Sequence, residues 1–214
     1  MSNYTLTHGS HANREEGMCL MEAVAYLAGE PHTYAPECAC PVLTEYAIVI
    51  NDAMGDGPNG DALRARYLHD LAPMLVGSRS TPDVEQARAY VLADHAVRIF
   101  APLALDSAGL GDEAAKLRSL DAVVDKQTAA KASEAVEASM PVEWSSSAMA
   151  WVLSPHSGAQ AALAAMNATN AAACAAEAAY AAKSAGRASA AAGARTAAWG
   201  AARQALVKAL EAAP

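Results

Sequence analysis

The segment 155–214 is about half alanine, and this composition restricts the fold of the chain more than any other feature. Alanine has the highest intrinsic helix propensity, so the segment should be helical even where its packing is weak. Gly186 and Gly193 each reduce that propensity by up to about 1 kcal/mol, and they mark where we expect a bend or a close contact. Because the segment is too long for one unsupported helix, we expect it to pack on itself, on the preceding residues or on a second chain.

The first half of the chain also has helical periodicity. A first helix is predicted over 15–28, where Glu15 and Glu16 favour the positive helix end and Gly29 ends it. A second helix should begin near Pro41 and end at Gly55, with a buried side formed by Leu43, Ala47, Ile50 and Met54. Its stretch "YAIVI" alone would suit a strand, but the length of the periodic segment favours a helix. The segment 55–61, "GDGPNGD", is predicted to be a loop before a third helix over 62–75.

The clearest helix start lies at 81–85. Thr81 is a natural N-cap residue, and Pro82 suits the first helical position. The predicted inner stripe of this helix consists of Val84, Ala87, Val91, His95 and Ile99. Further helices are predicted within 111–120 and 123–141, and Trp144 and Trp151 beyond them are one heptad apart. The fold class is therefore all-α, with a helical bundle over 1–154 and an alanine-rich helical tail over 155–214.

The net charge and the first residues of the sequence limit the partners and the cellular location that we expect. A net charge of −8 argues against binding nucleic acid through its phosphate backbone. The chain starts with a polar segment that does not resemble a signal peptide, and no run of residues is apolar enough to span a bilayer. We therefore expect a cytoplasmic protein whose four cysteines are reduced, without a membrane partner.

Residues 8–41 hold three of the six histidines and three of the four cysteines. These are ligands that zinc prefers, and the candidate set is His11, His32, Cys38 and Cys40. The last three can meet within one loop, whereas His11 would have to be brought to them by the fold. The "CAC" spacing is not that of a known zinc knuckle, and the second cysteine pair of such sites is missing.

Two other interpretations of this segment remain open. In one, Cys19 is a nucleophile whose thiol is activated at a helix N-terminus, with His8, His11 or His32 as its base. The stretch "GMCLMEAVAYLAGEPH" loosely resembles the nucleophile helix of transglutaminase-like and papain-like cysteine hydrolases, which also need strands that this chain does not offer. In the other, the cysteines are small buried apolar residues and the histidines are surface or capping groups.

A wider pattern, "HGSH…GMCLMEAVAYLAGEPH…PECACPVLTEY" followed by "LVGSRSTP" and the alanine-rich tail, resembles a family of proteins found in actinobacteria and their bacteriophages. No activity is established for that family, so the resemblance implies a bacterial cytoplasmic setting and no site residues. On this basis we expect a non-catalytic accessory or binding protein, related to phage and acting through protein or ligand contacts. An enzyme that uses Cys19 or a bound metal is the alternative.

In the tail, Arg195, Trp199 and Arg203 are spaced to lie along one side of a helix. The arginines could bind an anionic ligand or the acidic part of another subunit, or they could be solubilising charges with Trp199 packed inward. A long helix covered by small side chains buries little area alone. We therefore predict a homo-oligomer, most simply a dimer, formed through the tail.

Overall fold

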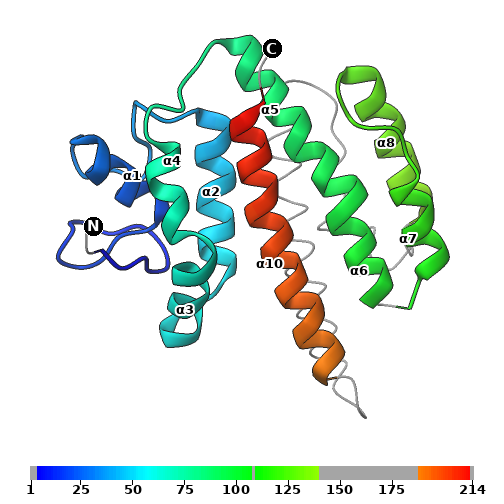
Figure 1. Ribbon diagram of the computed structural model, residues 1–214, viewed down its shortest axis with the longest axis horizontal. Coiled ribbons are helices and arrows are strands. Elements are labelled where there is room, and N and C mark those ends of the chain that lie inside the picture. The colour runs from blue at the N-terminus through cyan, green and yellow to red at the C-terminus, as the bar shows by residue number, and fades with distance from the viewer. Residues whose placement is uncertain (1–3, 108, 140–187, 213–214) are drawn as a thin grey trace. The chain divides into compact units, whose positions relative to one another are not determined.

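The computed structural model describes residues 4–107, 109–139 and 188–212, in which every regular element is a helix (Figure 1). The predicted all-α fold class is therefore confirmed. Trp144, Trp151 and Gly186 lie outside the described residues. In chain order the elements are α1 (Leu20–Ala28), α2 (Pro41–Ala53), α3 (Gly57–Tyr67), the 3₁₀ turn η1 (His69–Leu71), α4 (Ala72–Leu75), α5 (Pro82–His95), the π-helical turn η2 (Ala96–Phe100), α6 (Ala101–Ser107), α7 (Gly111–Arg118), α8 (Lys126–Ser139) and α10 (Ala188–Glu211).

The chain forms two compact units. One comprises Met1–Arg88 with Leu206–Pro214, and the other comprises Ala89–Ala205. The boundary falls inside α5 and again inside α10. No helix among the described residues is both long enough and apolar enough to cross a membrane.

In the first unit, α1 packs on both α2 and α4. The core that they share is made of fully buried side chains, which are Leu20, Met21, Leu43, Tyr46, Ile50, Leu68, Leu71 and Leu75. The four residues predicted for the buried side of α2 are all buried. The stretch "YAIVI" is helical as predicted, because it lies within a thirteen-residue helix that begins at Pro41.

α1 begins later than the sequence pattern indicated. The helix was predicted from Glu15, but its first residue is Leu20 and Cys19 is the N-cap. Gly17 has a φ of +141°, a conformation that residues with a side chain rarely adopt and that cannot continue a helix. The predicted end is confirmed, because Gly29 is the C-cap with a φ of +75°. Residues 4–18 consequently form no regular element, and we call them the N-terminal arm.

The loop predicted over 55–61 is wrong, because α3 already begins at Gly57. Asp56 is the N-cap, and the proline of the first turn is tolerated because its missing N–H would have no helical partner there. The buried Arg64 joins this helix to the end of α2. Its guanidinium donates to the carbonyls of Asn51 and Gly55, each at 2.8 Å, and thereby satisfies acceptors that the end of α2 leaves open.

The predicted helix start at Pro82 is confirmed, but the predicted inner stripe of α5 is mostly wrong. Of its five residues only His95 is buried, and the others are half-buried. The buried residues lie on the neighbouring face and continue through η2; they are Arg88, Ala89, Leu92, Ala93, Ala96, Val97 and Phe100. The prediction followed the β-branched residues, whereas the helix buries the face whose alanines allow closer approach. His95 directs its Nδ1 to the carbonyl of Val91, 2.9 Å away.

In the second unit, α7 packs on α6, η2 and α8. The core cluster consists of Ala93, Val97, Leu105, Ala114, Leu117, Val123, Ala132 and Val136. Asp94 of α5 joins two segments beside this cluster. Its carboxylate pairs with Arg98 of η2 at 2.6 Å and accepts the backbone N–H of Val123 at 2.9 Å. The helices predicted within 111–120 and 123–141 are both present, as α7 and α8.

Candidate functional site

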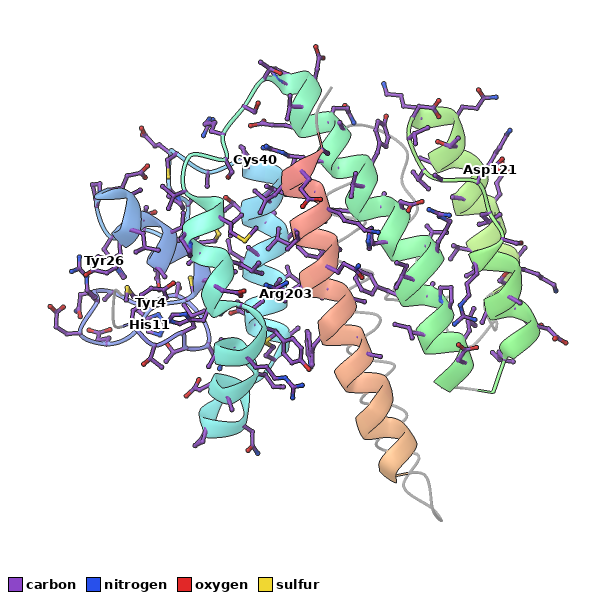
Figure 2. The ribbon with its side chains drawn as sticks, viewed as in Figure 1. Tyr4, His11, Tyr26, Cys40, Asp121 and Arg203 are labelled. Carbon is purple, nitrogen blue, oxygen red and sulfur yellow. The ribbon has the colours of Figure 1, made fainter. Side chains whose placement is uncertain are left out.

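The N-terminal arm is held on the first unit at several points. Leu6 is inserted into the core. Tyr4 stacks on His69 with ring centroids 4.4 Å apart and donates its hydroxyl to the His69 carbonyl at 2.9 Å. Arg14 lies over the ring of Tyr26 in α1, 4.0 Å from its centroid. Figure 2 shows Tyr4, His11 and Tyr26 close together at this side of the unit. The arm is therefore an ordered segment despite its lack of regular secondary structure.

Glu22, in the first turn of α1, is the polar centre of this region. Its side chain is only 1% exposed. One carboxylate oxygen, Oε2, accepts the Cys19 backbone N–H at 2.8 Å and lies 2.8 Å from Nδ1 of His11. The other oxygen, Oε1, accepts the His11 backbone N–H at 2.8 Å and lies 3.5 Å from Nε2 of His32. One carboxylate thus joins the arm, the start of α1 and the loop that follows α1.

The hydrogen bonds to Glu22 determine its protonation state. Burial by itself raises the pKa of this carboxyl group, because a charge is poorly solvated in the interior. The backbone N–H groups of His11 and Cys19, together with the His11 ring, oppose burial and bring the pKa below its ordinary value. Glu22 is therefore an ionised acceptor near neutral pH.

His11 links Glu22 to a hydroxyl group. While Nδ1 faces Glu22, Nε2 on the other side of the ring lies 3.1 Å from Oγ1 of Thr7. Thr7 is itself fixed by the arm, because its N–H donates to the Met18 carbonyl at 2.8 Å. His32 completes the cluster with its Nε2 3.1 Å from the His11 carbonyl. Carboxylate, imidazole and hydroxyl thus follow one another in hydrogen-bonding order.

Two residues at the end of α2 form hydrogen bonds with the N-terminal arm. The buried Asn51 donates to the Thr7 carbonyl at 3.0 Å and accepts the N–H of Leu20 at 3.2 Å. Asp52, next in the chain, accepts the N–H of Gly9 at 3.0 Å. These contacts fix the backbone on both sides of Thr7, so the Thr7–His11 geometry is set by the fold rather than by side-chain rotation alone.

Cys19 lies at the N-cap of α1 but is only 3% exposed. Burial raises the pKa of its thiol to about 12, and the nearby Glu22 carboxylate adds to this effect. A helix N-terminus usually favours the thiolate, but here the desolvation and the negative charge outweigh it. His8, one of the three histidines considered as its base, is paired with Asp56, with Nδ1 2.8 Å from the carboxylate. This arrangement does not activate Cys19 as a nucleophile.

The four predicted zinc ligands are not brought together. His11 and His32 meet at Glu22, whereas Figure 2 shows Cys40 at the start of α2, away from His11. Within the described ranges, no three His, Cys, Asp or Glu side chains are grouped so that they could hold a metal ion. The two predicted histidine ligands contact the Glu22 carboxylate instead.

Cys38 and Cys40 lie in the loop before α2, and both are free thiols. The N–H of Cys38 donates to Glu30 at 2.8 Å, and its carbonyl accepts the N–H of Arg79 at 2.9 Å. The N–H of Cys40 donates to Oγ of Ser78 at 3.0 Å. Their backbones thus connect the loop to the segment before α5. Burial raises the pKa of the Cys38 thiol, and Glu30 adds to the increase.

The tail residues singled out in the sequence are only partly described. Trp199 is 5% exposed and points inward, Arg203 is half-buried, and the side chain of Arg195 lies outside the description. Among the side chains of α10 whose burial is described, from Ala197 onward, the exposed positions are Ala197, Gln204, Lys208 and Glu211, and they follow one stripe.

Sequence reasoning missed Glu22 and Thr7 as site residues. A signal for Glu22 was present, because an N-cap residue followed three positions later by Glu is the pattern of a capping box, with Cys19 in the place of Ser or Thr. No comparable pattern marks Thr7. Its role depends on the arm folding back over α1.

The described residues thus form an all-α protein in which one buried carboxylate, that of Glu22, is among the contacts that hold an ordered N-terminal arm. Comparison with protein-family models, curated proteins and solved structures finds no match for the chain.

Proposed function

We propose that this protein is an accessory binding protein of the bacterial cytoplasm, related to phage, that acts through protein contacts and performs no chemistry at Cys19. The proposal rests on the contacts of Glu22 and the burial of Cys19 in the His/Cys-rich segment 8–41. Glu22 is ionised and its oxygens are engaged by His11, His32 and the start of α1, while the Cys19 thiol is buried with a raised pKa. These residues stabilise the shape of the first unit.

The tail supports a self-associating protein. The exposed stripe of α10 begins with an alanine and continues through Gln204 to the oppositely charged Lys208 and Glu211. Because Ala197 is small and Gln204 is uncharged, this stripe allows close approach of a second copy. We therefore propose a homodimer in which the two α10 helices face each other through this stripe.

The oligomeric state tests this part of the proposal. The full chain should have about twice its 21.9 kDa mass in light scattering. Replacing Ala197 by Glu and Gln204 by Glu, both at exposed positions, should return it to a monomer. Removing the whole tail is a poorer test, since Leu206 and Ala209 are buried in the fold. Replacing Ala62 and Ala115 by Glu, at exposed positions on α3 and α7, is the control and should leave the dimer intact. A wild-type chain that stays monomeric at high micromolar concentration would contradict the proposal.

The binding role is tested by affinity capture of the full chain from its host, with the monomeric variant as a parallel bait. A partner retained by both baits in stoichiometric amount supports an accessory role. Elemental analysis of the same sample, purified without a histidine tag, should find no stoichiometric zinc. Stoichiometric zinc lost on changing His11 or Cys38 would instead favour the metal-dependent alternative.

A further inference from the structure

The order of groups from Glu22 through His11 to Thr7 is that of a nucleophile with its base and the residue that orients the base. The carboxylate is 2.8 Å from Nδ1 of His11, and Nε2 is 3.1 Å from the Thr7 hydroxyl oxygen. Both distances are within hydrogen-bonding range. Hydrogen positions follow from this network. Because the ionised Glu22 can only accept, Nδ1 of His11 carries a proton, and in the neutral form of the ring the lone pair of Nε2 faces the Thr7 hydroxyl.

The Thr7 hydroxyl has a second possible hydrogen-bond partner, the Met18 carbonyl, but this contact is longer. Oγ1 of Thr7 also lies 3.3 Å from the Met18 carbonyl, farther than it lies from Nε2 of His11. Thr7 and His11 are each half-buried rather than fully enclosed. The backbone of Gly17 packs directly against this pair, since a Cβ atom there would lie 2.6 Å from Oγ1 and 2.8 Å from Nε2, and it helps to hold the two groups together.

We propose that Thr7 is an activated acyl acceptor, with His11 as its general base and Glu22 as the positioning residue. Oγ1 of Thr7 attacks the carbonyl carbon of an activated ester while its proton passes to Nε2 of His11. The bond from the carbonyl carbon to the leaving oxygen then breaks, and that oxygen takes the proton from Nε2. The products are an ester on Thr7 and the free alcohol or phenol. This inference goes beyond the proposed binding function, and either can fail without the other.

The expected acceleration is that of general-base assistance alone. The backbone N–H groups of Thr7, Gly9, His11 and Cys19 already donate to acceptors within the protein, so none of the four is free to stabilise an oxyanion. Positioned general bases contribute about 10²- to 10⁴-fold. We therefore expect Thr7 to react faster than an ordinary hydroxyl by that factor, without the larger acceleration of a complete hydrolase.

The test uses the full chain with p-nitrophenyl acetate at neutral pH, followed by peptide mass spectrometry. The internal control is Thr5, two residues earlier and exposed. Acetylation of Thr7 should be at least about 10²-fold faster than that of Thr5, and hydroxylamine should remove the product because it is an ester. Equal rates at Thr5 and Thr7 would overturn the proposal, whatever the variants show.

Variants separate activation from mere accessibility. Thr7→Ser should remain reactive at position 7, and Thr7→Val should give no adduct there. His11→Gln should reduce the rate at Thr7 to that at Thr5. If His11→Gln does not fold, Thr7 labelling in the native wild type is compared with labelling in urea. Activation by the fold predicts that the ratio of Thr7 to Thr5 labelling falls to about one on unfolding. A ratio unchanged in urea, or full reactivity in folded His11→Gln, would refute the role of His11.

Discussion

Glu22→Gln is the substitution that most directly tests the organisation of the first unit. A glutamine has nearly the same shape, but it keeps one acceptor oxygen and replaces the other by an NH₂ donor. If the NH₂ group occupies the Oε2 position, it faces the N–H of Cys19 and the His11 ring. If it occupies the Oε1 position, it faces the N–H of His11. At least one buried donor therefore loses its acceptor in either orientation.

The expected loss in the free energy of unfolding is roughly 2–4 kcal/mol. An orphaned buried N–H accounts for about 1–3 kcal/mol of this, and the remaining bonds weaken because they are no longer charge-assisted. Glu30→Gln is the matched control. Glu30 also accepts two backbone N–H groups, from Glu37 and Cys38 at 2.8 Å each, but it lies in a more solvated loop. Its replacement should have a clearly smaller effect.

The pH dependence gives the same experiment a second readout. The folded protein lowers the pKa of Glu22, so this group stabilises the fold above its unfolded pKa of about 4.3. That contribution is lost as the pH falls through the lower, folded pKa. The stability difference between wild type and Glu22→Gln should therefore shrink below about pH 4.

Urea unfolding measures the global effect, and hydrogen exchange of peptides covering residues 4–22 measures the local one. Exchange is needed because two compact units need not unfold together. The reasoning predicts that Glu22→Gln exposes the arm and the start of α1 to exchange, while α7 and α8 keep their protection. A variant within about 0.5 kcal/mol of wild type, with an unchanged arm, would refute the central role of this carboxylate.

Two further outcomes follow from the same region. Cys19 should resist alkylation at pH 8 until the protein unfolds, because burial raises its pKa to about 12; a thiol titration with and without urea measures this, and rapid labelling of the native protein would contradict it. Gly17→Ala should lower the melting temperature more than Gly9→Ala. Both glycines have a positive φ, but only a Cβ at Gly17 would contact other atoms, at 2.6 Å from the nearest, and equal losses would contradict this.

The helices of this protein could largely be predicted from the sequence, because their signals are local. Alanine content, Pro41 and Pro82 in first turns, and Gly29 at a helix end each act within one or two turns of chain. Errors arose where local signals conflicted. The proline and the three glycines of 55–61 indicated a loop, although Asp56 and Pro58 also suit a helix start, and a helix begins at Gly57.

The candidate site could not be predicted in the same way. His11 and His32 were identified as chemically important, but they were expected to meet Cys38 and Cys40 rather than Glu22. The only pattern that marks Glu22 is its capping-box spacing from Cys19, and this pattern does not indicate that the carboxylate is buried and shared by two histidines.

The sequence alone therefore determined the helical class, most helix positions and the acidic, alanine-rich character of the chain, all of which depend on composition or on neighbours within a turn. Only the tertiary structure decided which face of α5 is buried, that the arm folds over α1, and that Thr7, His11 and Glu22 lie in hydrogen-bonding order. The physical reason is the range of the interactions. The contacts between Asn51 and Thr7 join residues more than forty positions apart, and they form only when helix packing has brought the arm and α2 together.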